Sequence, residues 1–147
     1  MTDIGGLSLL FLSAFTSATL LPGSSEVTLL ALLAGGQATP ALLFAVATLG
    51  NVLGSTLNWA LGRCFSAYRE RRWFPVTRAT QRAAEAWFKR YGVWSLLLAW
   101  VPVIGDPITV VAGLLRVGLL RFLLLVTLAK AGRYGVIVVA FHLWNAR

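Results

Sequence analysis

Long apolar runs and short polar breaks alternate along the 147-residue chain. Two runs, 41–61 and 119–143, are each long enough to cross a membrane, because a helix needs about 20 apolar residues to span a hydrocarbon core of about 30 Å. Two other apolar stretches, 7–36 and 92–116, are interrupted near their middle by proline, glycine and an acidic residue. The pattern therefore predicts two full transmembrane helices, each preceded by a broken helical segment.

The two breaks share one spacing. Pro22 and Glu26 are four residues apart in the first break. Pro102 and Asp106 have the same separation in the second, at an offset of 80 residues. Short, Gly/Pro-interrupted segments at matching places in two halves are typical of transporters built as inverted repeats, although chance is the alternative. The residues expected to form the breaks are Pro22, Gly23, Pro102, Gly105 and Pro107.

Each broken segment is predicted to be a re-entrant hairpin, whose two half-helices enter the membrane, turn and leave on the same side. Eight of the 13 Lys and Arg residues fall in the segment 63–90, which the positive-inside rule places in the cytoplasm. Opposed hairpins then leave Arg116 and Arg121 in the cytoplasm as well. The competing topology, in which 7–36 and 92–116 each cross the membrane fully, puts both arginines outside.

Composition narrows the class of protein. The chain is 58% hydrophobic and 12% charged, whereas a soluble domain is about 45–50% apolar and about 25% charged. A soluble enzyme and a disordered tail are therefore excluded. The net charge of +8 belongs to a cytoplasmic loop rather than to a nucleic-acid site, and one histidine and one cysteine argue against a catalytic metal centre. We expect a single all-α integral membrane domain, 1–147, without metal or cofactor.

The basic segment 63–91 is expected to contain an interfacial helix at its end. Arg82 and Lys89 recur on one helical face, and Trp87 and Tyr91 lie on another. A basic face beside an aromatic, apolar face suits the surface of an anionic leaflet. A solvated helix that only sets the topology is the alternative.

Four charged residues lie well inside the predicted membrane segments, away from their ends, namely Glu26, Asp106, Lys130 and Arg133. An acid at the membrane centre costs at least about 2.5–3.5 kcal/mol, and is usually kept because it faces a cavity, pairs with a cation or carries protons. Capping of the second half-helix is the simpler role for the two acids. The two cations lie one turn apart, where they can pair with the acids or bind a lipid phosphate, and snorkelling is their alternative. We predict a substrate or proton pathway built from these four.

Polar residues also recur at helical spacing along the first predicted span. Such a stripe usually indicates close helix packing with hydrogen bonds between helices, and the lining of a cavity is its functional alternative. The residues considered for a cavity lining are Asn51, Ser55, Asn58 and Thr109.

Several short motifs, in their order along the chain, are similar to those of a known family. They are Pro22-Gly23-Ser24-Ser25-Glu26, Gly50-Asn51-Val52-Leu53-Gly54, Phe88-Lys89-Arg90-Tyr91-Gly92, Pro102-Val103-Ile104-Gly105-Asp106-Pro107 and Val111-Ala112-Gly113. Over nearly its whole length the chain resembles the DedA family of bacterial inner-membrane proteins, also called SNARE-associated or VTT-domain proteins, in its short YqaA-like branch. The resemblance implies opposed re-entrant hairpins, movement of lipids such as undecaprenyl phosphate between leaflets, and a link to the proton motive force.

The resemblance carries over to some site residues and not to others. Glu26 matches the acid of the family's first hairpin, but Gln37 and Ala38 stand where many members have a second acid. The two arginines that flank the second hairpin's proline in many members are absent around Pro102. This departure leaves the second hairpin without these two cations for phosphate recognition. Lys130 and Arg133 are then the other sources of positive charge.

We therefore expect a transporter rather than an enzyme. It would move a polyprenyl phosphate or a phospholipid between leaflets of the bacterial inner membrane, coupled to the proton motive force. A proton- or cation-coupled transporter of small solutes and a structural protein for envelope maintenance are the alternatives. Expected partners are membrane lipids and a second copy of the chain, because two half-span hairpins form a small scaffold.

Overall fold

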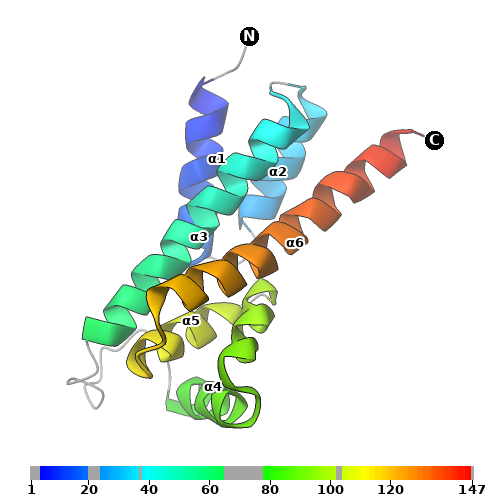
Figure 1. Cartoon of the computed structure of the whole chain (residues 1–147). Coiled ribbons are helices and arrows are strands. Elements are labelled where there is room, and N and C mark those ends of the chain that lie inside the picture. Colours follow the sequence, from blue (N-terminus) through cyan, green and yellow to red (C-terminus); the bar gives the residue numbers. More distant parts are fainter. Residues whose placement is uncertain (1–3, 20–23, 37, 65–77, 102–103, 147) are drawn as a thin grey trace. The chain divides into compact units, whose positions relative to one another are not determined.

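A computed structural model describes residues 4–19, 24–36, 38–64, 78–101 and 104–146 (Figure 1). Within these ranges all regular secondary structure is helical, which agrees with the predicted all-α class. The elements are α1 (Ile4–Ser17), α2 (Ser24–Ala34), α3 (Pro40–Cys64), α4 (Arg78–Tyr91), the 3-10 helix η2 (Gly92–Trp100), α5 (Gly105–Leu114) and α6 (Leu119–Asn145).

Helices α3 and α6 contain the two predicted spans. With 25 and 27 residues and a rise of 1.5 Å per residue, they are about 37 and 40 Å long. Both are long and apolar enough to cross a membrane. Helix α3 begins with Pro40, whose fixed φ suits the first helical turn, and the Thr39 hydroxyl accepts the Leu42 backbone N–H at 3.4 Å.

Helices α1, α2 and α5 are too short to cross a membrane alone. They have 14, 11 and 10 residues, and are therefore about 21, 17 and 15 Å long, against about 30 Å of hydrocarbon. Among the expected break residues, Gly105 and Pro107 lie in the first turn of α5, where the missing N–H of proline has no helical partner to lose. Pro22, Gly23 and Pro102 lie outside the described residues.

The apolar run after α4 forms a 3-10 helix over nine residues, where the sequence predicted an ordinary half-helix. This element is unusually long for a 3-10 helix, because the tighter winding gives poorer hydrogen bonds. It begins at Gly92, whose φ of +60° lets the chain turn directly out of α4. It ends with the Val101 N–H donating to the Leu98 carbonyl at 2.9 Å.

The chain divides into two compact units. Unit 1 comprises Met1–Gly54 and Lys130–Arg147, and unit 2 comprises Ser55–Ala129. Unit 1 therefore contains α1, α2, the first part of α3 and the second part of α6. Unit 2 contains the rest of α3, then α4, η2, α5 and the first part of α6. Each unit is described by itself below.

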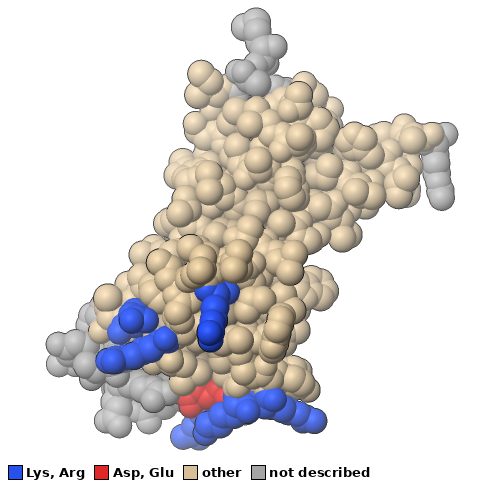
Figure 2. Space-filling model, viewed as in Figure 1, with Lys and Arg blue, Asp and Glu red and all other residues tan. Residues whose placement is uncertain are grey.

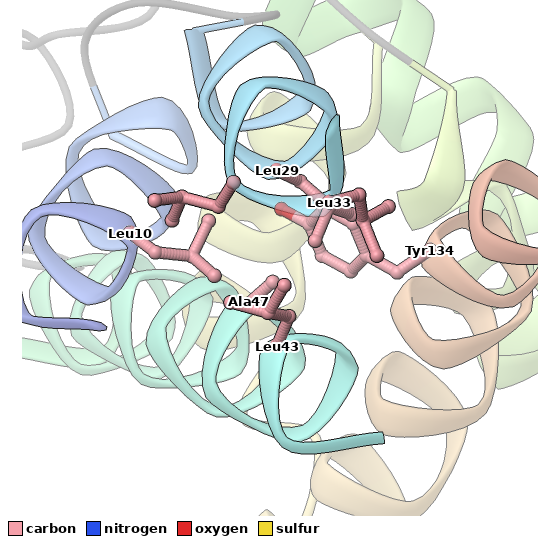
Figure 3. Close-up of a cluster of buried hydrophobic side chains, with 7 residues drawn as sticks. Leu10, Leu29, Leu33, Leu43, Ala47 and Tyr134 are labelled. Atoms are coloured by element: carbon pink, nitrogen blue, oxygen red, sulfur yellow. The ribbon is translucent and has the colours of Figure 1, made fainter. Parts of the chain in front are cut away.

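The core of unit 1 lies where its four helices meet. Figure 3 shows side chains from all four converging, with the Tyr134 ring of α6 among leucines of α1, α2 and α3. A Cβ on Gly50 or Gly54 of α3 would lie 2.7 or 2.5 Å from a backbone carbonyl oxygen of α1. Helix α3 therefore rests directly on the α1 backbone. The buried members are Leu10, Leu29, Leu32, Leu33, Leu43, Ala47 and Tyr134.

In unit 2, α5 is the buried element. All of its residues from Ile108 to Leu114 are buried. Its Gly113 lies against the Trp59 carbonyl of α3, and Gly62 of α3 lies against the Val110 carbonyl of α5, so that a Cβ at either glycine would overlap the other helix's backbone. The two helices therefore touch along their backbones.

Candidate functional site

An ion pair lies at the start of α2 in unit 1. The Arg133 Nε of α6 donates to the Glu26 Oε1 at 2.6 Å. The Arg133 side chain is 12% exposed and the Glu26 side chain 32% exposed. The pair is therefore largely shielded from solvent, and the carboxylate is its more exposed member. One of the cross-pairings that the sequence allowed is therefore present, and the carboxylate is engaged by a cation of another helix.

A buried chain of hydroxyl and amide groups runs beside the ion pair. The Tyr134 Oη donates to the Ser25 Oγ at 2.9 Å and accepts from the Asn51 Nδ2 at 2.8 Å. The Ser25 Oγ in turn donates to the Ser17 Oγ at 3.2 Å. All four residues are buried. The chain therefore links α3, α6, α2 and α1 through polar groups that the apolar surroundings would otherwise leave unsatisfied.

Helices α1 and α2 pack side by side in antiparallel orientation. Ser13 and Thr28 share a hydrogen bond of 3.1 Å between their hydroxyls, while the bond between Ser17 and Ser25 joins the end of α1 to the start of α2. Figure 1 shows the two helices side by side within unit 1. This pairing brings the start of α2, with Glu26, beside the end of α1.

Two further oxygens in this region are buried acceptors. The Asn51 Oδ1 and the Thr48 Oγ1 have no hydrogen-bond partner among the described residues, and their residues are 2% and 8% exposed. Both belong to α3 and lie one turn apart on one face. Buried oxygens of this kind can accept a hydrogen bond from a water molecule or a ligand.

Lys130 is the first residue of unit 1 on α6. It is buried in the chain, with 2% of its surface exposed. It precedes Arg133 by nearly one turn of α6, and the two cations lie on neighbouring parts of one face. Unit 1 therefore holds two shielded cations and Glu26 within its helices.

The other predicted acid lies in unit 2. Asp106 is partly buried in the first turn of α5, and its backbone carbonyl accepts the Thr109 hydroxyl at 2.6 Å. The Asn58 Nδ2 donates to the same hydroxyl at 3.4 Å, across from α3 to α5. The Ser55 Oγ is buried and has no partner among the described residues. Asn51 and Asn58 thus hydrogen-bond to other helices, the arrangement typical of close helix packing.

Sequence reasoning did not identify Tyr134, Ser25 and Ser17 as members of the site. A tyrosine and two serines within apolar helices gave no periodic signal of their own. The available signal was adjacency, since Ser25 precedes Glu26 and Tyr134 follows Arg133. Among the described residues there is no group of three or more His, Cys, Asp or Glu side chains that could hold a metal ion.

Comparison with known families identifies the fold family. The family model described as the VTT domain matches residues 21–143. The chain belongs to the VTT-domain family. This confirms the resemblance that the motifs of the sequence indicated, and among solved structures none matches the chain.

Three relatives of this VTT-domain protein are informative. The inner membrane protein YqaA of Escherichia coli (strain K12) is 42% identical over 95% of this chain and 94% of its own. An uncharacterized protein of Haemophilus influenzae is 36% identical, over 87% of this chain and 82% of its own. The undecaprenyl phosphate transporter A of Staphylococcus aureus is 30% identical over 54% of this chain and 43% of its own.

These relatives settle the cellular location. YqaA is an inner membrane protein, and the present chain matches it over nearly the full length of both. Helices α3 and α6 supply segments of sufficient length and apolar character to cross a bilayer. The VTT-domain protein is therefore an integral protein of the bacterial inner membrane.

Proposed function

We propose that this protein moves a lipid phosphate, either a polyprenyl phosphate or a phospholipid, between the leaflets of the inner membrane. The observation that carries the proposal is the ion pair between Glu26 and Arg133, held among membrane helices. The partial match to an undecaprenyl phosphate transporter supports the lipid phosphate as substrate class. As part of the same proposal, the protein acts as a transporter and not as an enzyme.

The proposed step is an exchange of anions at Arg133. A guanidinium binds carboxylate and phosphate oxygens in similar geometry, so a lipid phosphate can replace the Glu26 carboxylate as its partner. Protonation of Glu26 weakens its hold on Arg133 and frees the cation for the phosphate. Because a buried cation without a partner is costly, release of the phosphate returns Arg133 to the deprotonated acid. Proton and lipid movement are thereby coupled, and the proton motive force supplies the direction.

We propose further that α1 with α2, and η2 with α5, are the two opposed re-entrant hairpins, over 7–36 and 92–116. The shortness of α1, α2 and α5 supports this, since none can cross a membrane alone. The equal Pro-to-acid spacing in the two halves supports an inverted repeat. Hairpins that thin the barrier from both sides would shorten the path for a polar headgroup.

The remaining predicted residues take supporting roles in this proposal. Lys130 adds positive charge beside Arg133, which helps to attract an anionic headgroup. Asp106 is the corresponding proton-carrying acid of the second hairpin. The proposed lining of the path comprises Asn51, Ser55, Asn58 and Thr109.

Lipid movement between leaflets of proteoliposomes tests the proposal. The purified protein is reconstituted with labelled phospholipid or polyprenyl phosphate, and is compared with the E26Q, R133Q and D106N variants. We expect E26Q and R133Q each to lower the rate at least about ten-fold, since a loss of about 1.4 kcal/mol of stabilisation at the limiting step is sufficient for that. The matched control is E85Q, which removes a glutamate from α4 in unit 2.

Exchanging the two charged residues distinguishes a role of the ion pair in lipid movement from a role in stability. The double variant E26R/R133E restores an ion pair between the two positions and should restore the helical content and thermal stability that either single reversal loses. Lipid movement should stay low, because the acid and the base have changed helices. Normal lipid movement in a folded E26Q protein contradicts the proposal. A proton-linked ion flux without movement of any lipid would instead support the transport of small solutes.

A further inference from the structure

Helix α4 has one side packed against the protein, and most of its other described residues are exposed. Phe88 is 6% exposed and lies on the inner side, where α4 contacts η2 and α5. Ala83, Trp87 and Tyr91 follow one another at intervals of four residues and are all exposed. They therefore form a continuous apolar strip on the surface of unit 2.

The aromatic side chains of this strip form a preorganised pair. The rings of Trp87 and Tyr91 are stacked with centroids 5.0 Å apart, while the two residues are 44% and 45% exposed. Trp94, three residues further on in η2, is 66% exposed. Tryptophan and tyrosine with exposed rings are concentrated where a membrane protein meets the headgroup layer, because each ring has an apolar body and a polar edge.

The same helix also carries exposed cations, of which Arg82 and Lys89 lie on a different helical face from the aromatic strip. Arg82, Lys89 and Arg90 are exposed, and Glu85 is the acid among the described side chains of α4. The Arg90 guanidinium lies 5.5 Å from the centre of the Tyr91 ring, so the cation and the aromatic pair form one surface. Figure 2 shows Lys and Arg side chains, with an acidic side chain among them, over the part of unit 2 where α4 lies in Figure 1.

We infer that α4 and Trp94 form a docking surface for an acidic phospholipid leaflet, with the aromatic pair inserted at the headgroup level and the cations against lipid phosphates. Charge complementarity favours this occupant, since each Lys or Arg near an acidic surface raises binding roughly five-fold. The small Ala83 side chain allows the helix axis to approach the membrane plane. A protein partner would need acidic groups matched to these particular cations, whereas an acidic leaflet offers phosphates at every position. The inference is independent of whether the protein moves lipids.

The depth of a spin label on α4 tests this inference in the full chain. A nitroxide is attached at A83C in a C64S background, and the protein is placed in nanodiscs of phosphatidylcholine with or without phosphatidylglycerol. Its accessibility to oxygen and to a water-soluble nickel chelate reports depth. We expect the label to lie about 5–10 Å into the headgroup and acyl boundary with acidic lipid, and closer to water without it. A label at N145C, at the end of α6, is the positional control.

The contribution of the cations to binding of the acidic leaflet is tested by adding R82Q and K89Q to the labelled protein. The shift in depth caused by phosphatidylglycerol should be lost, while the label at N145C behaves as before. Equal accessibility in both lipid compositions would overturn the inference, because acidic headgroups would then not be recognised. Magnetic coupling between labels on two copies would also overturn it, by showing that the strip faces a second copy of the chain.

Discussion

At the scale of single residues, two adjacent positions of α2 meet two adjacent positions of α6. Ser25 accepts a hydrogen bond from the Tyr134 hydroxyl, and Glu26 accepts one from the Arg133 guanidinium. The neutral bond between Tyr134 and Ser25 is buried more deeply than the charged bond between Arg133 and Glu26. Ser25 and Tyr134 are each only 1% exposed. The neutral bond is thus suited to hold the two helices in register, while the charged one is the bond that exchanges partners in the proposed mechanism.

Removal of the Tyr134 hydroxyl tests this division of roles. The Y134F variant keeps the ring in the core but leaves Ser25 and Asn51 without their shared partner. Hydrogen bonds between membrane helices contribute about 0.6 kcal/mol on average and up to about 1.7, so we expect the free energy of unfolding to fall by about 1–2 kcal/mol. Unfolding in mixed detergent micelles measures it. Y91F, on the exposed strip of α4, should have no effect, and an equal loss in both variants would contradict the role.

At the scale of elements, glycines decide how closely helices approach. In unit 2, α3 and α5 touch through Gly62 and Gly113, each lying on a backbone carbonyl of the other helix. This contact holds the second half of α5 against α3. In unit 1, Gly50 and Gly54 bring α3 onto α1 in the same way. Close approach of this kind is a common source of stability where lipid removes the hydrophobic drive for helix association.

Alanine at Gly113 should separate α5 from α3. Its methyl group would overlap the Trp59 carbonyl, and because backbone cannot move aside cheaply we expect a loss of about 1–3 kcal/mol in the free energy of unfolding. The matched control is G132A, also in a helix, where a Cβ would meet nothing within 4 Å. That variant should be as stable as the wild type or more stable, since alanine favours a helix over glycine by about 1 kcal/mol. A greater loss in G132A than in G113A would contradict the role given to the contact.

At the scale of the whole molecule, two paths of the chain through the membrane place its ends on opposite sides. With hairpins at 7–36 and 92–116, the chain crosses fully only at α3 and α6, and the two ends lie outside the cytoplasm. If both segments cross fully instead, both ends lie in the cytoplasm. The charge pattern favours the hairpins, because Arg116 and Arg121 then lie on the positive side.

Cysteine labelling in intact cells distinguishes the two paths. Cys64, the last residue of α3, is exposed and is the single cysteine of the chain. A maleimide that cannot cross the inner membrane should label it only after lysis, since the basic segment is expected in the cytoplasm. In a C64S background, N145C at the end of α6 should be labelled in intact cells once the outer membrane is permeabilised. Labelling of N145C only after lysis would support two further full spans and contradict the hairpins.

The sequence by itself determined the elements whose signal is local. The length of apolar runs predicted α3 and α6, because a bilayer requires a minimum helix length. Proline and glycine predicted that 7–36 would not form one continuous helix, and the alternation of basic and aromatic positions predicted α4. The motifs predicted the family, which the comparisons confirm.

Only the tertiary structure decided which faces meet. The sequence contained Glu26 and two candidate cations, but the partner of its carboxylate depends on how α2 and α6 are rotated against each other, 107 residues apart. The hydrogen bond between Ser25 and Tyr134 could not be predicted for the same reason. The 3-10 winding of η2 could not be predicted either, because an apolar run does not encode its own hydrogen-bond period. Hydrophobic length is a property of one segment, whereas a pairing is a property of two, and it exists only once the helices have packed.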